Sequence, residues 1–161
     1  MSMIVHPFPP VYDKHSEILI LGSFPSVKSR EEQFFYGHPK NRFWKVLAAV
    51  FDSSVPESIE DKMSFLISNR IALWDVVFSC EITGSADSSI KNVIPNDIYE
   101  ILGNSDIKRI FLNGKTAEKY YNKYIKEKIS VEAITLPSTS PANAKWTLEK
   151  LIAQWSKILT E

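Results

Sequence analysis

Cysteine is almost missing from this 161-residue sequence, in which Cys80 is the single example. One cysteine excludes an internal disulfide and a zinc site built from a cysteine cluster. Glycine is scarce as well, with 5 residues, and neither G-x-G-x-x-G nor a Walker lysine pattern occurs, which argues against a glycine-rich phosphate loop. No apolar run approaches the roughly 18 residues that span a bilayer, so we expect no membrane partner.

An excess of charge is also lacking, because 19 Lys and Arg residues balance 19 Asp and Glu residues. This balance excludes a polycationic nucleic-acid binder but permits a nucleic-acid enzyme with one local basic surface. The first residues show no basic region followed by an apolar stretch, so we expect no signal peptide and a cytoplasmic protein. The three histidines are scattered and accompany no carboxylate pair, so we expect neither a metal nor a cofactor.

What the chain does have is core-forming material: 44% of its residues are apolar and 12% are aromatic. This composition and length predict one globular domain over residues 1–161. Four short aliphatic segments are typical of buried strands, namely residues 18–22, 71–77, 107–112 and 131–136. Helical periods fall between and after them, at residues 43–51, 58–68, 115–127 and 144–159. This alternation predicts an α/β fold whose parallel sheet carries its functional loops at the carboxyl ends of the strands.

The longest segment without a helix or strand period follows the first strand, from Ser23 to Lys40. Loops of this length are uncommon in compact domains and are usually functional. Its aromatic residues, including Phe24 and Tyr36, argue against disorder.

Two long motifs lie about a hundred residues apart in this sequence. The first motif has two parts, Gly-Ser-Phe-Pro from Gly22 and Tyr-Gly-His-Pro-Lys-Asn-Arg-Phe-Trp from Tyr36. The second motif is Leu-Pro-Ser-Thr-Ser-Pro-Ala-Asn from Leu136. Together they resemble the uracil-DNA glycosylase superfamily, and within it the hypoxanthine (deoxyinosine) branch. The resemblance implies a three-layer α/β/α sandwich with a central four-stranded parallel sheet. It also implies a monofunctional, monomeric glycosylase that flips a deaminated base out of double-stranded DNA and hydrolyses its N-glycosidic bond.

The resemblance assigns the catalytic roles. Asn41 matches the residue that positions the attacking water, and Ser23 could assist it. Phe24 stands where several branches keep an Asp or Asn as the water activator, and Leu136 stands where the uracil-specific branch has a histidine. Both departures argue against a fast uracil enzyme. Asn41 also precedes an amphipathic helix, so its side chain could instead cap that helix.

Base contacts are expected from Gly22, Phe24, Tyr36, Asp75 and Asn113. Tyr36 aligns with the aromatic residue that stacks on the flipped base, although it could equally be part of the core. Asp75 could bind the base or cap a turn, and Asn113 could be turn chemistry only. Small residues at Gly22, Ser23 and Gly37 would leave room for a purine.

Backbone contacts to DNA are expected from hydroxyls, basic groups and a stiff apolar tip on the two motifs. The predicted DNA-binding residues are Ser26, His38, Arg42, Ser138, Thr139, Ser140, Pro141, Ala142 and Asn143. Lysines and arginines flank both motifs, at Lys28, Arg30, Lys40, Arg42, Lys45, Lys145 and Lys150.

Other functions fit parts of the same pattern. A mismatch-specific uracil-DNA glycosylase is the first alternative, and xanthine is a further possible base. A catalytically inactive DNA-binding relative is another. A flavodoxin-like nucleotide-binding module, beginning at Gly22 and Ser23, belongs to a different class.

Overall fold

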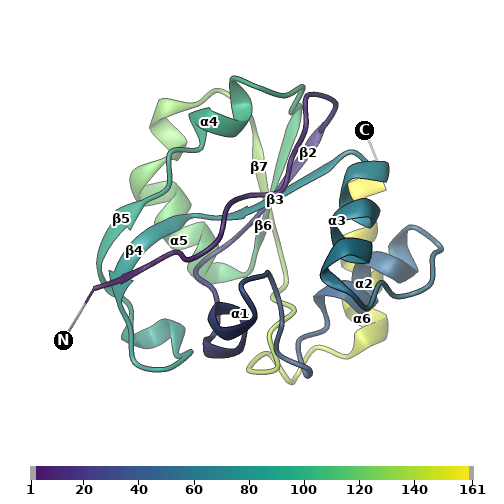
Figure 1. The fold of residues 1–161 in the computed structure, drawn as a ribbon, viewed down its shortest axis with the longest axis horizontal. Coiled ribbons are helices and arrows are strands. Elements are labelled where there is room, and N and C mark those ends of the chain that lie inside the picture. Colours follow the sequence, from purple (N-terminus) through teal and green to yellow (C-terminus); the bar gives the residue numbers. More distant parts are fainter. Residues whose placement is uncertain (1–2, 160–161) are drawn as a thin grey trace.

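The computed structural model describes residues 3–159, and its centre is a four-stranded parallel sheet (Figure 1). The spatial order of the strands is β3 (Ile71–Asp75), β2 (Ile18–Gly22), β6 (Arg109–Asn113) and β7 (Ala133–Leu136). Every residue of β3 is buried, as are four of the five residues of β2 and of β6. Their largely apolar composition follows from this burial on both faces. The predicted parallel sheet is confirmed.

The register places the carboxyl ends of the four strands at one edge of the sheet. Gly22 pairs with Asp75, and Asn113 pairs with Leu136. Leu21 of β2 pairs with Leu112 of β6, and Gly22 and Asn113 are the residues that directly follow this pair in their strands. Four residues that the sequence singled out therefore end adjacent strands, and the loops after them meet.

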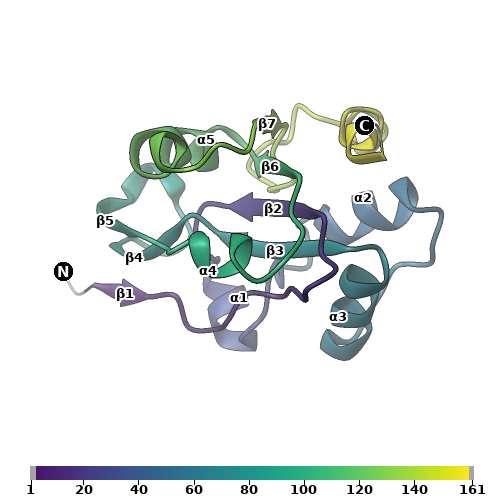
Figure 2. The same ribbon diagram turned by 90° about the horizontal axis from the view of Figure 1, so that it is seen from above.

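Helices cover both faces of the sheet, which confirms the predicted layers. Figures 1 and 2 show α2 (Phe43–Val50), α3 (Ile59–Ser68) and α6 (Leu148–Trp155) on one face and α5 (Lys115–Tyr124) on the other. The short helix α4 (Tyr99–Leu102) precedes β6. Three 3₁₀ turns complete the helical elements, at Asp87–Ser89, Lys126–Lys128 and Ser156–Leu159.

The last helix begins later than its hydrophobic period predicts. Thr147 caps α6 by accepting a hydrogen bond from the Lys150 amide, so residues 144–146 belong to the preceding loop. Ile59 and Met63 of α3 and Leu148 of α6 are exposed, although the helical period places them on the apolar face of their helices.

A second, antiparallel sheet was not predicted. It consists of β1 (Ile4–Val5), β4 (Val77–Glu81) and β5 (Lys91–Pro95), in the order β1-β4-β5. The segment predicted as one strand to residue 77 breaks after Asp75, and β4 begins at Val77. Exposed Phe78 and Ile94 obscure the alternation that would have indicated these strands.

The N-terminal segment lies across the domain, as its prolines indicate, but it also contributes to the sheets. β1 pairs with β4, and Val11 forms an isolated bridge with Leu73. This path carries His6 into the interior, where it is buried. Met1 and Ser2, at its start, lie outside the described residues.

The long loop after β2 contains one helix that was not predicted, α1 (Val27–Glu32). Ser26 caps it, and Gln33 ends it in the left-handed conformation. Six residues are too few to establish a period. Among residues 3–159, no helix has the length and hydrophobicity needed to cross a bilayer.

Candidate active site

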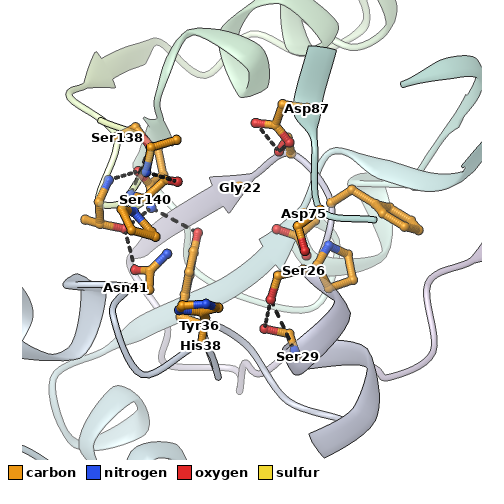
Figure 3. A pocket seen from close by; sticks show the side chains of 18 of the residues that line it. Gly22, Ser26, Ser29, Tyr36, His38, Asn41, Asp75, Asp87, Ser138 and Ser140 are labelled. Carbon is orange, nitrogen blue, oxygen red and sulfur yellow. Dashed lines mark hydrogen bonds between the residues drawn. The ribbon is translucent and has the colours of Figure 1, made fainter. Parts of the chain in front are cut away.

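A cavity of about 540 Å³ opens at the carboxyl ends of the parallel strands. Both sequence motifs line it, together with Asp75, Asn113 and the turn at residues 85–88 (Figure 3). Most predicted site residues come together there: Gly22, Ser23, Phe24, Ser26, Tyr36, His38, Asn41, Asp75, Asn113, Ser138, Thr139, Ser140, Pro141 and Ala142. Arg42 and Asn143 do not line it.

Asn113 and Thr139 fix the two motifs against each other. The Thr139 amide donates to Oδ1 of Asn113 at 3.1 Å, which sets the orientation of that side-chain amide. Nδ2 of Asn113 then donates to the Thr139 hydroxyl at 3.0 Å and to the Tyr36 hydroxyl at 3.1 Å. The Asn113 side chain therefore links the two motifs by hydrogen bonds, and its role is not limited to the turn.

Asn41 combines a capping role with a place in the cavity. Its Oδ1 accepts from the Phe43 amide at 2.9 Å and from the Thr139 hydroxyl at 2.9 Å. A carbonyl oxygen has two lone pairs, so both are used. Among the described residues Nδ2 of Asn41 has no hydrogen-bond partner, and it is the group that this side chain can still offer to a ligand.

Tyr36 has an unusual backbone and a polar environment. Its φ is 53°, a conformation that bulky residues rarely adopt and that marks functional sites. One ring face stacks on Phe43, with centroids 4.0 Å apart and an interplanar angle of 20°. Burial and the nearby Asp75 carboxylate raise the pKa of Tyr36, so its hydroxyl keeps its proton. Because that oxygen already accepts from Asn113, the proton is available for a second bond.

Asp75 forms a buried pair with His6 instead of capping a turn. Its Oδ2 lies 2.8 Å from Nε2 of His6, while Nδ1 of His6 lies 2.9 Å from the Phe8 carbonyl. A carbonyl only accepts, so Nδ1 carries a proton and one further proton is shared between Nε2 and Oδ2. Sequence reasoning missed this role of His6, because nothing in its spacing connects it with a residue 69 positions away.

Oδ1 of Asp75 and the Tyr36 hydroxyl converge on Gly22. A Cβ at Gly22 would lie 2.5 Å from Oδ1 and 2.6 Å from the tyrosine oxygen. Glycine therefore lets both oxygens approach the strand end. The expectation that Gly22 and Gly37 leave empty room for a purine is wrong, since the space beside Gly37 holds the Glu32 carboxylate. The space for a purine is instead the cavity of about 540 Å³ described above.

Asp87 is a second acidic side chain of the cavity, and sequence reasoning missed it. The Ser23 hydroxyl donates to its two carboxylate oxygens at 3.2 and 3.4 Å. Although Asp87 as a residue is solvent-exposed, its carboxylate faces the cavity wall (Figure 3), where desolvation raises its pKa. Hydrogen bonds from Ser23 and Thr116 lower that pKa, while the Asp75 carboxylate raises it further.

The turn that carries Asp87 is bound to α1 by two further hydrogen bonds. The Val27 amide donates to the Ser85 hydroxyl at 2.9 Å, and the Arg30 guanidinium donates to the Gly84 carbonyl at 2.6 Å. The only feature of the sequence that indicates this turn is the Gly84-Ser85 pair, with Asp87 two residues later.

Arg42 holds the second motif in place by hydrogen bonds to its backbone carbonyls. Its guanidinium donates to the carbonyls of Ser140, Asn143 and Trp146. The Asn143 side chain in turn donates to the Ser138 carbonyl at 2.9 Å. These bonds leave Pro141 and Ala142 exposed at the tip of the loop.

Other predicted DNA ligands make local bonds. The Ser26 hydroxyl caps α1, and Nδ1 of His38 accepts from the Lys40 amide at 3.1 Å. Phe24 is buried against His6, with ring centroids 6.0 Å apart. No group of three metal-ligating side chains occurs among residues 3–159.

Three comparisons relate this chain to known proteins. The family model described as the uracil DNA glycosylase superfamily matches residues 9–159. A hypoxanthine DNA glycosylase from Methanosarcina acetivorans is 34% identical over 160 residues, which cover 97% of this chain and 98% of the relative. A hypoxanthine DNA glycosylase from Methanosarcina barkeri is 33% identical over 153 residues, covering 93% and 94%. The solution NMR structure of a candidate uracil DNA glycosylase from Methanosarcina acetivorans matches with a TM-score of 0.80 and 31% identity, over 97% of this chain and 99% of the other.

Proposed function

This chain belongs to the uracil-DNA glycosylase superfamily, and from that premise we propose that it removes hypoxanthine from deoxyinosine-containing DNA. The domain would flip the deaminated base from the duplex into the cavity and hydrolyse its N-glycosidic bond, leaving an abasic site. Extrusion costs a few kcal/mol and least for a mispaired base, which favours hypoxanthine opposite thymine over adenine in a normal pair.

The observation that carries this proposal is the pair of oxygens beside Gly22. Oδ1 of Asp75 has no donor among the described residues, so it can accept from a ring N–H. The Tyr36 hydroxyl retains a proton, so it can donate to a ring carbonyl. Hypoxanthine offers this N–H and carbonyl side by side, whereas adenine offers an acceptor nitrogen and an amino group. A pocket built for one pattern rejects the other by leaving buried polar groups unpaired.

Cavity size and the second motif favour hypoxanthine over uracil. A volume of about 540 Å³ is ample for a purine. Leu136 is buried and apolar, so it cannot assist a departing pyrimidine as a histidine would. The alternative to the hydroxyl contact of Tyr36 is stacking of its ring on the flipped base, a contact worth roughly 1–3 kcal/mol.

Asn41 would position the attacking water through Nδ2, because its Oδ1 is occupied. The transition state of glycosidic cleavage is oxocarbenium-like, so placing the water matters more than strong activation. Ser23, at the end of β2, faces the same cavity and would assist.

The second motif would enter the groove of double-stranded DNA. Its exposed tip, Pro141 and Ala142, is short, stiff and apolar, as a wedge that fills the gap left by a flipped nucleotide must be. Ser138 and Ser140 line the cavity beside the tip and would contact the backbone phosphates.

Single-turnover excision from matched duplexes tests the proposal. The duplexes hold one deoxyinosine, one deoxyuridine opposite G, one deoxyxanthosine or an unmodified base. We expect the fastest release from deoxyinosine, none from adenine, and an intact strand at the abasic product. Faster release of uracil would replace hypoxanthine by uracil as the substrate, and no release from any duplex would refute a glycosylase.

A further inference from the structure

We propose that Asp87 is the carboxylate that accepts the proton of the attacking water, held in place by Ser23. The inference rests on the proposed glycosylase function and deepens it. It adds a residue from outside both motifs, on a turn that the sequence did not single out.

A comparison of the possible proton acceptors that line the cavity leaves Asp87 as the candidate. Three lining side chains carry a group of the kind that serves as a general base, namely His38, Asp75 and Asp87. Nδ1 of His38 already accepts from the Lys40 amide, so its other nitrogen carries the proton of the neutral ring. Asp75 has one oxygen bound to His6 and the other beside Gly22, where the base is read.

Asn41 cannot replace a carboxylate at this step. Both lone pairs of its Oδ1 are engaged, by the Phe43 amide and the Thr139 hydroxyl. Nδ2 can orient a water by donating to its oxygen, but an amide nitrogen does not accept the water's proton. When this proton passes to a side chain and not directly to solvent, that side chain must be a different one.

Asp87 has the position and the partners for that task. Its carboxylate lines the cavity next to Ser23, the residue that directly follows β2 (Figure 3). The Ser23 hydroxyl donates to it and retains an oxygen lone pair that can accept a water hydrogen. The turn around it is anchored by the Val27–Ser85 and Arg30–Gly84 bonds, which keep the carboxylate in place.

The reaction balances without another reactant. The bond from C1′ to the base nitrogen breaks, and its electron pair leaves with the base. The water oxygen bonds to C1′, and the water's proton passes to Asp87, directly or through Ser23. The base then takes a proton from solvent, and Asp87 returns its proton to solvent, which completes the hydrolysis.

The pH dependence follows from the groups around Asp87. Asp75, Tyr36 and Cys80 interact electrostatically with Asp87, and the raised pKa values of Tyr36 and Cys80 keep these two side chains uncharged at neutral pH. Desolvation first and Asp75 second raise the pKa of Asp87. Since the base form is the deprotonated one, the rate should fall as pH decreases through this raised pKa.

The test is single-turnover excision from a deoxyinosine duplex by Asp87→Asn and Asp87→Ala, measured across pH with saturating enzyme. We expect at least about a 100-fold loss at neutral pH, the lower bound for general base catalysis, with duplex affinity unchanged. The acid limb of the profile should disappear, and formate should partly restore Asp87→Ala. Asp97→Asn is the matched control, because Asp97 is exposed, accepts a hydrogen bond from the Tyr99 amide and does not line the cavity.

Specific outcomes would overturn the inference. Wild-type rates in Asp87→Asn would do so, as would a slowed variant that keeps the acid limb and ignores formate. Should the variants not fold, a wild-type profile without an acid limb would also overturn it. None of these three outcomes contradicts the glycosylase proposal. That proposal fails only if the wild-type protein releases no base.

Discussion

Asn41 serves as a helix cap and as a proposed water ligand, and these roles can be separated experimentally. Asn41→Ala removes the bond to the Phe43 amide and the bond from Thr139. We expect excision from deoxyinosine to fall by about 100-fold or more, duplex binding to change little, and the free energy of unfolding to drop by about 1 kcal/mol.

Ser58→Ala is the control for Asn41, since the Ser58 hydroxyl accepts from the Asp61 amide in the first turn of α3 and Ser58 lies outside the cavity. It should cost similar stability and no activity. If both variants lose activity in proportion to stability, the asparagine acts as a cap alone.

Tyr36 can bind the base through its ring or through its hydroxyl. Tyr36→Phe keeps the ring and its stacking on Phe43 but removes the proton donor and the acceptor for Asn113. We expect a 10- to 100-fold slower single-turnover excision of hypoxanthine, as for loss of one hydrogen bond of about 1.4–2.8 kcal/mol. Tyr36→Leu should be slower still. Equal rates for Phe and Tyr would remove the hydroxyl from base recognition.

Among the elements, the N-terminal segment has a larger role than its irregular path indicates. It brings His6 to Asp75, and both side chains are almost fully buried. We expect His6→Ala to destabilise the protein by about 3–5 kcal/mol, since it leaves an unpaired buried carboxylate. Replacing Asp75 by Asn in the same chain should recover part of this loss. Additive effects of the two substitutions in denaturant unfolding would show that the pair is not coupled.

The sequence predicts the parallel sheet better than it predicts the walls of the site. β2 and β6 are continuous aliphatic runs that end at Gly22 and Asn113, so pattern and tertiary structure agree. By contrast, α1 is too short for a period, and the turn carrying Asp87 is held by bonds to distant residues. The motifs could identify Asn41 and Tyr36 as candidates, but only the fold places His6 against Asp75 and Asp87 in the cavity.

At the scale of the whole molecule, zero net charge is compatible with exposed basic side chains near the two motifs. Lys28, Lys40 and Lys45 of the first motif region and Lys145 and Lys150 beside the second are exposed. We expect duplex binding to weaken with salt, with a slope of log affinity against log salt on the order of −2 to −5 for about 2–5 phosphate contacts. Fluorescence anisotropy over a salt series measures it, and an affinity independent of salt would contradict phosphate contacts.

The bond between Thr139 and Asn41 joins parts of the chain that are 98 residues apart. At about 5–20 residues per second, a ribosome needs roughly 5–20 s to synthesise that interval. Throughout this time the first motif is already outside or within the exit tunnel, but β7 and the hydroxyl that orients Asn41 do not yet exist. Activity must therefore begin late in translation, and a prematurely terminated chain cannot assemble the site.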